Sequence, residues 1–463
     1  MHDERNRELL DFSMRVALVT AGDYFSEYGG GQIYVRQLAR ALNGRGFDVH
    51  ILGVAAGGRD EDRQSSPIDD AGVKVWNVSV NPIAGPSRSL ALSRALQARL
   101  RDMISLIGPD VVHAHGWKAA IAFATRSLGM ACFITAHHGG IVCPNGMLMN
   151  RDDRLCEVPT SPSACISCAT HFVPGGPIWN RLLSAVADSG RIALAECFRN
   201  MRSVPYITPA LKIPLTVADK IEEIAAISLP HCHVIAPSHA VERALLRNGL
   251  SRNQVVFLPH GSVEFGQLQS RPARLEGTLR LGYIGRIDRA KGLHVLMDAL
   301  RLMPDPNAIV LHVFGTAATR REWRYLRDLE QRAKGLPVRW HGKVAHNRIA
   351  EAYELVDVLV FPSICTEAFG LSVSEAVLAG KTVVTSRCGG PEDIVREGVD
   401  GFVVDANDAS ALARRLQQLA ADRSLLVQPE RTVPHLLSVD AHVDALIALY
   451  RDALTTVSAT NQA

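Results

Sequence analysis

The sequence contains no run of about eighteen uninterrupted apolar residues, so no membrane-spanning helix is expected. It also has little net charge, because 50 Lys and Arg against 47 Asp and Glu leave a formal charge of +3. That balance argues against a protein that coats nucleic acid, and any basic binding site must be local. With 47% hydrophobic and 21% charged residues, the composition is that of a globular protein rather than a disordered or fibrous one.

The chain also begins without the pattern of an export signal. Residues 1–8 are mostly charged or polar, and the apolar core of a secretory signal does not follow them. We therefore expect a cytoplasmic protein, with peripheral attachment to the inner face of a membrane as the alternative. In the cytoplasm, the nine cysteines are expected to be thiols or metal ligands before disulfides.

Short runs rich in Val and Ile alternate with segments of helical length along most of the chain. This alternation is typical of parallel strands joined by crossover helices, and it predicts an α/β fold with two successive sheets. Clear examples are the strands expected at 16–20, 111–114 and 133–136 in the first half and at 280–284 and 358–361 in the second.

The domain boundaries follow from where this alternation is interrupted. The polar stretch 264–278 lacks either periodicity and is the expected linker, so we predict an N-terminal domain at 1–265 and a C-terminal domain at 279–430. The alternation also stops over about 139–230, as it would in an insertion within the first domain. The segment 435–463 holds a last helix with one apolar face.

Three consecutive glycines at 29–31 follow the first expected strand and precede a helix. Glycines let the backbone approach a ligand closely, and the N-terminus of a helix offers free N–H groups to an anion. The spacing does not fit Gly-x-Gly-x-x-Gly, and no acidic residue closes the second strand, so a nicotinamide-type dinucleotide site is disfavoured. A tight turn between strand and helix explains the glycines equally well.

The segment 285–292 carries two cations where a strand of the second domain gives way to a helix. Arg286 and Lys291 are five residues apart across a turn, a spacing that lets a guanidinium and an ammonium converge on one diphosphate. Their positive charge would help a phosphate to leave. A basic loop in solvent is the alternative explanation.

The segment 362–376 places two carboxylates eight residues apart around a glycine-bearing turn that opens a helix. The backbone amides of 369–371 are suited to hold a phosphate, while Glu367 and Glu375 can accept hydrogen bonds from sugar or ribose hydroxyls. Taken singly, each acid is better explained by the ordinary preference of carboxylates for the start of a helix.

Together these segments resemble the donor domain of the family 4 retaining glycosyltransferases. The resemblance covers most of the chain, and its combination of motifs is specific although each motif is weak. It implies the GT-B architecture, in which two doubly wound, Rossmann-like α/β domains face each other across a cleft and the last helix crosses back onto the first domain. The matching segments are 29–31, 109–116, 258–261, 285–292, 338–343, 367–375 and 389–395.

The resemblance implies a glycosyltransferase that moves a sugar from a UDP- or GDP-sugar to a hydroxyl acceptor with retention of anomeric configuration. Front-face attack, in which the leaving phosphate takes the proton of the acceptor, gives this outcome, and no cofactor is required for catalysis. The acceptor is expected to be a glycan or a lipid-linked molecule in the synthesis of a polysaccharide or glycoconjugate. No nucleic-acid partner is expected.

The resemblance also assigns roles residue by residue. Arg286 and Lys291 would neutralise the donor diphosphate, Glu375 would bind the ribose, and Glu367 and His137 would lie beside the transferred sugar. The residues expected to contact the donor are Gly30, Gly31, Gly285, Ala368, Phe369, Gly370, Leu371 and Glu375.

Other histidines carry weaker expectations. His113 and His115 end a strand, where packing and local hydrogen bonds are the ordinary role. His138 stands where many relatives carry an acid, which leaves open which sugar hydroxyls or which acceptor the site binds. His260 stands where relatives carry asparagine, and we interpret it as a change in a turn without chemical meaning.

Two other functions use the same fold. One is a nucleotide-sugar epimerase, and the other is a non-catalytic nucleotide-sugar-binding partner of another transferase. The presence of every charged residue expected on the donor side argues against both.

Four cysteines in the predicted insertion form a further candidate site. A Cys-x2-Cys pair with two more thiols can complete a tetrahedral zinc site, which would be structural. The pattern resembles a four-cysteine insertion found in a subset of the family. Reduced buried thiols and a disulfide are the alternatives. The four residues are Cys143, Cys156, Cys165 and Cys168.

Overall fold

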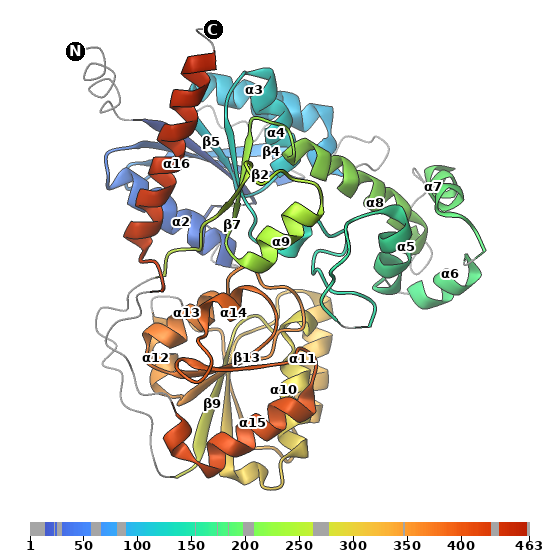
Figure 1. Ribbon diagram of the computed structural model, residues 1–463, viewed down its shortest axis with the longest axis vertical. Coiled ribbons are helices and arrows are strands. Elements are labelled where there is room, and N and C mark those ends of the chain that lie inside the picture. The colour runs from blue at the N-terminus through green and yellow to red at the C-terminus, as the bar shows by residue number, and fades with distance from the viewer. Residues whose placement is uncertain are drawn as a thin grey trace.

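The computed structural model describes residues 14–460 except 23, 26–29, 57–65, 81–88, 153, 174, 184, 198–207, 263–276, 346–347 and 427–434. Most of the predicted linker at 264–278 therefore lies outside the described residues. The described parts form two α/β domains, one above the other in Figure 1, each built around its own sheet.

The N-terminal domain is built on an eight-stranded sheet with the order β3-β4-β2-β1-β5-β6-β7-β8. Among the described pairings, only that of β3 with β4 is antiparallel. Continuous apolar runs form its central strands because a parallel sheet is covered by helices on both faces. The strands are β1 Arg15–Ala21, β2 Asp48–Ala56, β3 Ile68–Asp70, β4 Val73–Val80, β5 Val111–Ala114, β6 Cys132–Thr135, β7 Cys232–Ala236 and β8 Val255–Phe257.

The C-terminal domain contains a six-stranded, parallel sheet with the order β11-β10-β9-β12-β13-β14. Both sheets thus confirm the predicted α/β, doubly wound fold class. The strand order reverses between β1 and β5 in the first sheet and between β9 and β12 in the second. Such reversals leave a crevice at the carboxyl ends of the strands, where α/β proteins bind ligands. The strands are β9 Leu279–Ile284, β10 Ile309–Phe314, β11 Val338–Gly342, β12 Val358–Phe361, β13 Thr382–Ser386 and β14 Gly401–Val404.

Helices cover both faces of each sheet. Alternate residues of β1 enter different cores, since Val16 and Leu18 pack with α2 and α16, whereas Val19 packs with α3 and α4. The apolar spacing of residues 89–107 predicts one helix there. In the structure, the extended backbone of Ser93 (φ −67°, ψ 124°) separates a short 3-10 turn from α3. The helices outside the insertion are α2 Gly30–Asn43, α3 Arg94–Ile107, α4 Lys118–Ser127, α9 His239–Arg247, α10 Leu293–Leu302, α11 Arg320–Arg332, α12 Ile349–Glu354, α13 Leu371–Leu378, α14 Gly390–Ile394, α15 Ala409–Ala421 and α16 Val439–Thr460.

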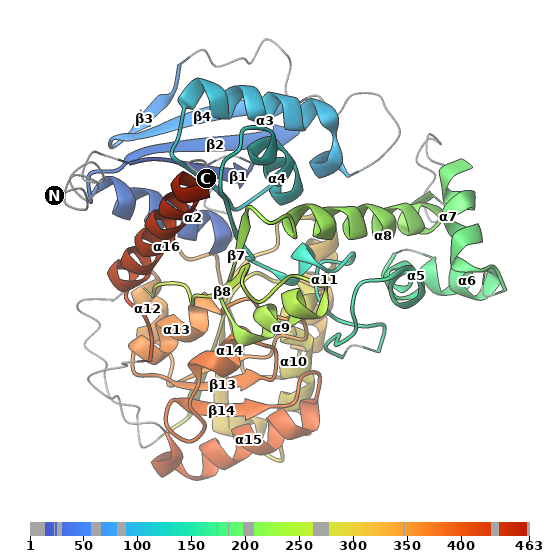
Figure 2. The same ribbon diagram turned by 45° about the horizontal axis from the view of Figure 1, so that its top comes forward.

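Four helices lie between β6 and β7, where the sequence predicts an insertion. They project from the side of the N-terminal domain, with α6 and α7 farthest from both sheets (Figure 2). Within the described residues, no helix is both long and apolar enough to cross a bilayer. The four helices are α5 Pro162–His171, α6 Gly176–Leu182, α7 Asp188–Cys197 and α8 Thr208–Ile227.

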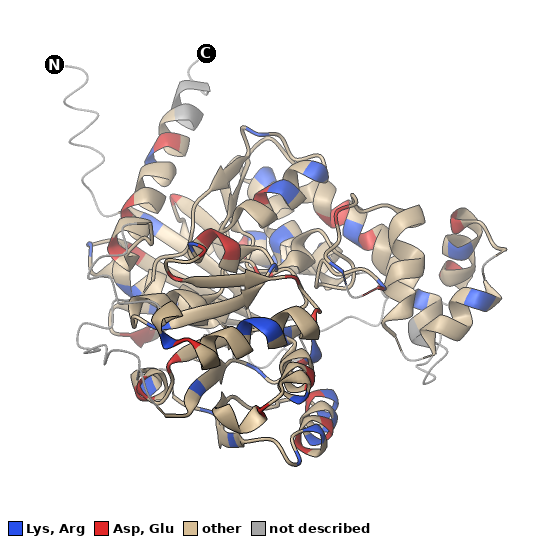
Figure 3. Ribbon diagram, turned by 60° about the horizontal axis from the view of Figure 1, so that its bottom comes forward, with Lys and Arg blue, Asp and Glu red and all other residues tan. Residues whose placement is uncertain are grey.

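The last helix, α16, packs against the N-terminal domain although it follows the C-terminal one (Figure 1). Its buried stripe of Val443, Leu446 and Tyr450 joins the core that contains Leu18 of β1 and Leu38 of α2. Figure 3 shows Lys and Arg intermixed with Asp and Glu over both domains, as the near balance of charge predicts.

Candidate active site

The loop after β9 holds the two cations that the sequence singles out. Asp288 accepts a hydrogen bond from Ala290 N at 2.8 Å and thereby caps the 3-10 turn Arg289–Lys291. Gly292 ends this turn with φ +70°, and a Cβ there would lie 1.8 Å from the Pro362 carbonyl oxygen. Only glycine permits this approach, which brings Lys291 against the end of β12.

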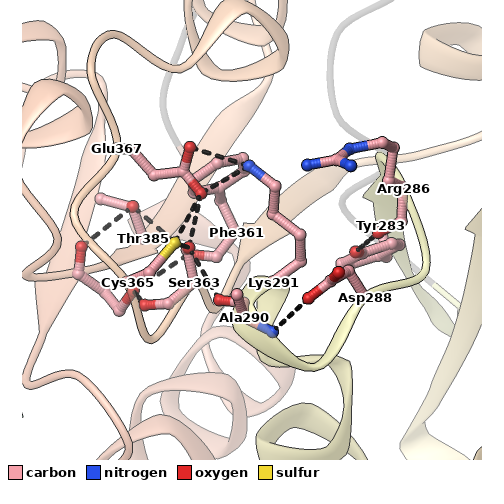
Figure 4. A network of polar contacts seen from close by, with 11 residues as sticks. Tyr283, Arg286, Asp288, Ala290, Lys291, Phe361, Ser363, Cys365, Glu367 and Thr385 are labelled. Atoms are coloured by element: carbon pink, nitrogen blue, oxygen red, sulfur yellow. Dashed lines mark hydrogen bonds and ion pairs between the residues drawn. The ribbon is translucent and has the colours of Figure 1, made fainter. Parts of the chain in front are cut away.

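Lys291 and Glu367 form an ion pair across the two loops. The Lys291 ammonium donates to both carboxylate oxygens, at 2.6 and 2.8 Å, and Ser363 Oγ donates to Glu367 Oε1 at 2.5 Å (Figure 4). Burial lowers the pKa of Lys291, but the Glu367 carboxylate outweighs this effect, so the pKa is raised above its ordinary value. The structure thus brings together two residues that the sequence assigns to different parts of a ligand.

Arg286 lies beside this pair without joining it. Its guanidinium points toward the Lys291 ammonium in Figure 4, and its side chain is exposed. No side-chain hydrogen bond or ion pair of Arg286 occurs among the described residues. Tyr283 Oη donates to the backbone carbonyl of Arg286 at 2.6 Å. The Lys291 ammonium lies between the Glu367 carboxylate and the Arg286 guanidinium (Figure 4), and two positive charges beside one carboxylate favour the arrival of an anion.

The start of α13 lies next to these side chains. Gly370, with φ +103°, precedes the helix, which begins at Leu371. Ala368 packs into the N-terminal core and Phe369 into the C-terminal one, so this segment spans both domains. In α13, Glu375 accepts a hydrogen bond from Tyr353 Oη at 2.8 Å, and burial raises its pKa to about 7.

The glycine-rich loop approaches this segment from the other domain. A Cβ on Gly30 would lie 2.9 Å from Leu371 Cδ1, so the N-terminus of α2 faces that of α13. Gly31 has no neighbour within 4 Å of its Cβ position and leaves the backbone open. Two helix starts present free amides and partial positive charge toward the same place. Gly285, in the C-terminal domain, directly follows β9.

The N-terminal wall of the site is a cluster of histidines at the ends of β5 and β6. His115 Nδ1 lies 2.9 Å from His137 Nε2, while His113 contacts Thr135 Oγ1 at 2.7 Å and Tyr450 Oη at 2.6 Å. Burial lowers the pKa of His113 to about 3 and moves the pKa of His115 and His137 well below the ordinary value. All three imidazoles are therefore neutral at physiological pH.

Other members of the same cluster come from distant parts of the chain. Tyr34 Oη lies 2.7 Å from His442 Nε2, which connects α2 to α16. The centroid of the His260 ring lies 4.2 Å from that of the Tyr34 ring and 5.4 Å from that of the Phe369 ring in the other domain. The sequence indicates only a change in a turn at His260, whereas the structure buries its ring at the contact between the domains.

Sequence reasoning missed Tyr34, His442 and Tyr450 as parts of this wall. Their partners are hundreds of residues away, so no local spacing reveals them. The available signal was the polar character of His442, which lies beside Val443 in the apolar stripe of α16. A histidine at such a position needs a hydrogen-bond partner in the core.

The cysteine-bearing part of the insertion contacts the C-terminal domain directly. Thr366 N donates to the Met147 carbonyl at 3.0 Å, and Met149 packs in the core of the C-terminal domain. Because Thr366 immediately precedes Glu367, the insertion helps to position the loop that carries this carboxylate.

The four cysteines of the predicted zinc site are neighbours. Burial and the proximity of Cys143, Cys156 and Cys165 together raise the pKa of Cys168 to about 11. Cys143 Sγ, however, donates to Asn145 Oδ1 at 2.8 Å. In the part of the chain that the structure describes, no three His, Cys, Asp or Glu side chains form a group that could hold a metal ion. The zinc site stays a prediction.

Comparison with known proteins assigns the family. The model described as "Glycosyl transferases group 1" matches residues 278–422, and the one described as "Glycosyl transferase 4-like domain" matches 29–166. The D-inositol 3-phosphate glycosyltransferase of Geodermatophilus obscurus is 33% identical over 451 residues, which cover 94% of this chain and 87% of the relative. The chain belongs to the family 4 glycosyltransferases.

Solved structures agree with the GT-B fold of this glycosyltransferase. A sucrose-phosphate synthase from Thermosynechococcus elongatus superimposes with a TM-score of 0.64 at 20% identity, over 96% of this chain and 100% of that one. HepE (Alr3699) of Anabaena, solved in complex with UDP and glucose, gives a TM-score of 0.56 at 16% identity, over 97% and 100%. In this glycosyltransferase the residues expected to bind the donor surround the contact between the two domains.

Proposed function

We propose that this glycosyltransferase takes its sugar from a nucleoside diphosphate sugar, with UDP or GDP as the nucleotide, and transfers it with retention of configuration. The observation that carries the proposal is the Arg286 guanidinium beside Lys291, which pairs with no side chain in the described parts of the chain and lies close to the facing starts of α2 and α13. This arrangement suits a diphosphate, whose oxygens accept hydrogen bonds from guanidinium, ammonium and backbone amides alike. HepE of Anabaena, which has this fold, was solved with UDP and glucose, and this supports the choice of donor.

The cations would act on the leaving group. Cleavage of the donor builds positive charge at the anomeric carbon and negative charge on the departing diphosphate. Arg286 and Lys291 would stabilise that negative charge as it forms. Since Lys291 is already fixed by Glu367, it needs little reorganisation when the charge develops.

The remaining side chains would orient the donor. Glu375, buried in α13, would accept hydrogen bonds from the ribose hydroxyls, and Glu367 from hydroxyls of the transferred sugar. His137 would lie beside that sugar on the N-terminal wall, held there by His115. Gly30, Gly31 and the start of α13 would contact the phosphates.

The proposal includes front-face attack rather than a covalent intermediate. A two-step route needs a carboxylate free to attack the anomeric carbon. The Glu367 carboxylate is engaged by Lys291 and Ser363, and Glu375 is buried against Tyr353. The leaving phosphate would instead take the proton of the acceptor hydroxyl, which gives retention.

The acceptor belongs to glycan, polysaccharide or glycoconjugate synthesis in this proposal, as a glycan or a lipid-linked molecule. A cytoplasmic location, with peripheral contact to the inner face of a membrane, follows from the same expectation. The relative from Geodermatophilus obscurus is named for the acceptor D-inositol 3-phosphate, a phosphorylated cyclitol. The four-cysteine site, if it holds zinc, would stabilise the insertion and supply no catalytic chemistry.

A panel of nucleotides and nucleotide-sugars tests the donor. A ligand at a hundredfold excess over its Kd adds about 2.7 kcal/mol to the stability of the folded state, which a thermal shift detects. We expect UDP- or GDP-sugars to protect the chain and Arg286→Gln to remove the protection. Product analysis then distinguishes transfer from isomerisation of the sugar. Protection by none of these ligands, or an isomerised nucleotide-sugar as the product, contradicts the proposal.

A further inference from the structure

The turn after β5 holds a lysine, Lys118, whose ammonium is turned toward the backbone. Trp117 adopts the left-handed conformation (φ 51°, ψ 34°) and its Nε1 donates to the Val54 carbonyl at 3.1 Å. This turn brings the Lys118 ammonium back to the His115 carbonyl, to which it donates at 3.0 Å. No ion pair of Lys118 occurs among the described residues. Burial, aided by the charge of Lys220, lowers its pKa to about 8.

The turn after β6 presents a second set of donors. Lys220 of α8 donates to the Gly140 carbonyl at 2.7 Å and pairs with Glu223. His138 Nδ1 accepts a hydrogen bond from Gly140 N at 3.0 Å. A Cβ on Gly140 would lie 2.6 Å from the His138 ring, so only glycine lets the imidazole lie here. Because Nδ1 accepts, the proton of the neutral ring must be on Nε2, which is free to donate.

The two turns are neighbours at the carboxyl edge of the N-terminal sheet. β5 and β6 pair in parallel, and the hydrogen bond between His115 and His137 joins the residues that follow them. Burial and the charges of Lys118, Lys220 and Arg286 together lower the pKa of His138 to about 4. These cations are therefore all within electrostatic reach of one imidazole.

The charges of this group do not cancel. Glu223 pairs with Lys220 and accepts a hydrogen bond from Ser89 Oγ, and its charge also acts on Lys118, so one carboxylate faces two ammonium groups. Among the described residues, the one hydrogen-bond partner of the Lys118 ammonium is the His115 carbonyl oxygen. A partly buried ammonium without a counterion is unfavourable, and a bound anion would remove that cost.

We propose that Lys118, His138 and Lys220 form an anion-binding subsite for the acceptor, and that the group it binds is a phosphate of the acceptor. The inference rests on the proposed function, because it places the acceptor on the N-terminal wall opposite the donor cations. A phosphate offers several acceptor oxygens, which match two ammonium groups and one imidazole N–H. A soluble sugar or cyclitol phosphate and a lipid-linked diphosphate share this chemistry.

Titration of the full chain, saturated with UDP to fill the donor site, tests the subsite. The probes are inorganic phosphate, D-inositol 3-phosphate, unphosphorylated inositol, and vesicles with and without a polyprenyl diphosphate sugar, at about 0.15 M salt. We expect at least about tenfold tighter binding in one of two comparisons: D-inositol 3-phosphate against inositol, or vesicles with the polyprenyl diphosphate sugar against vesicles without it. Preference for the soluble ester or for the loaded vesicle identifies the source of the phosphate.

Variants assign the effect to these side chains. Lys118→Gln should weaken binding of the phosphorylated probe about tenfold, Lys118→Arg should retain most of it, and His138→Ala should weaken it several-fold. The matched control is Lys334→Gln, which removes one positive charge from an exposed site. UDP binding and the thermal midpoint of each variant show whether it is folded. If Lys118→Gln does not fold, Lys220→Gln takes its place in the test.

The outcomes separate the two proposals. Wild-type protein that binds UDP but binds phosphorylated and neutral probes equally overturns the subsite and leaves the donor assignment intact. Equal losses in Lys118→Gln and Lys334→Gln also overturn it, because they reduce the effect to net charge. Wild-type protein that binds no nucleotide overturns the proposed function, and the acceptor assignment fails with it.

Discussion

Lys291 donates to both carboxylate oxygens of Glu367, at 2.6 and 2.8 Å, while Arg286 next to it pairs with no side chain among the described residues. One of the two expected diphosphate ligands is therefore neutralised in advance and the other is not. The two cations should consequently differ in how much the fold depends on them, although both should be needed for transfer.

The first prediction concerns these two cations. Arg286→Gln should reduce transfer about a hundredfold or more, because one donor to the developing charge is lost. Its unfolding free energy should stay within about 0.5 kcal/mol of wild type, since the side chain is exposed and makes no ion pair with the residues that the structure describes. Lys291→Met should lose transfer to a similar extent and also about 1–3 kcal/mol of stability, because the largely buried Glu367 carboxylate loses its partner.

The double variant Lys291→Met/Glu367→Gln is the control for this prediction. It removes the unpaired charge, so stability should return toward wild type while transfer stays absent. Steady-state transfer assays and chemical denaturation measure the two properties. Equal stability of Arg286→Gln and Lys291→Met would show that the ion pair contributes nothing to the fold.

The second prediction concerns the pH dependence of stability. Burial raises the pKa of Glu375 to about 7, whereas its ordinary value is 4.5. The folded state holds this proton more tightly than the unfolded state, so the contribution is full below about pH 4.5 and is lost as the pH rises to about 7. The unfolding free energy of Glu375→Gln lacks this dependence. Relative to that of wild type, it should therefore rise by about 3 kcal/mol between about pH 4.5 and pH 7.

Denaturation of both proteins at several pH values measures the difference, with Glu330→Gln on the surface as the control. A constant difference between Glu375→Gln and wild type over this interval would refute the raised pKa. The same titration should affect the donor, because an ionised carboxylate accepts hydrogen bonds from both ribose hydroxyls. UDP should therefore bind wild type more tightly as the pH rises through about 7.

The third prediction concerns the tautomer of His137. His115 Nε2 is buried and has no hydrogen-bond partner among the residues described, and a buried N–H without an acceptor is rarer than a lone pair without a donor. The proton of His115 is therefore expected on Nδ1, which donates to His137 Nε2. His137 then carries its proton on Nδ1 and offers it to the sugar. His115 is a positioning residue in this scheme.

Nitrogen NMR of the labelled histidines reads the tautomers directly. His115→Asn keeps a donor near the Nδ1 position and should retain more transfer than His115→Phe, with the loss mainly in kcat. A structural role alone would predict equal losses in kcat for two variants of equal stability. Observation of His137 protonated at Nε2 would reverse the assignment.

The fourth prediction concerns the four cysteines. If they bind zinc, metal analysis of the full chain should find about one equivalent, and Cys165→Ser/Cys168→Ser should abolish it. Cys197→Ser, at an exposed position of α7, is the matched control and should keep the metal. Less than about a tenth of an equivalent in wild type would exclude the site.

Most strands could be predicted from the sequence because buried parallel strands are continuous apolar runs. The strand β3 was missed since its residues, Ile68–Asp70, are mostly exposed at the sheet edge. The helix expected at 89–107 was too long because periodicity does not reveal the extended backbone at Ser93. The local sequence pattern thus predicts a strand well where both faces of the sheet are buried.

The site was predictable in part. Arg286, Lys291 and Glu367 follow strands β9 and β12, and the parallel pairing of these strands brings their following loops together. The ion pair between Lys291 and Glu367 was not predictable, because it depends on the close approach at Gly292. The contacts of Tyr34, His113 and Tyr450 depend on the docking of α16 and have no local sequence signal.

Helix α16 also bears on how the protein is made. Tyr450 and His442 complete hydrogen bonds with His113 and Tyr34 over sequence separations of 337 and 408 residues. While a ribosome is still translating the second sheet, the first sheet therefore lacks part of its core and of its histidine wall. Residues up to Tyr450 must therefore emerge from the exit tunnel before this core and this wall are complete.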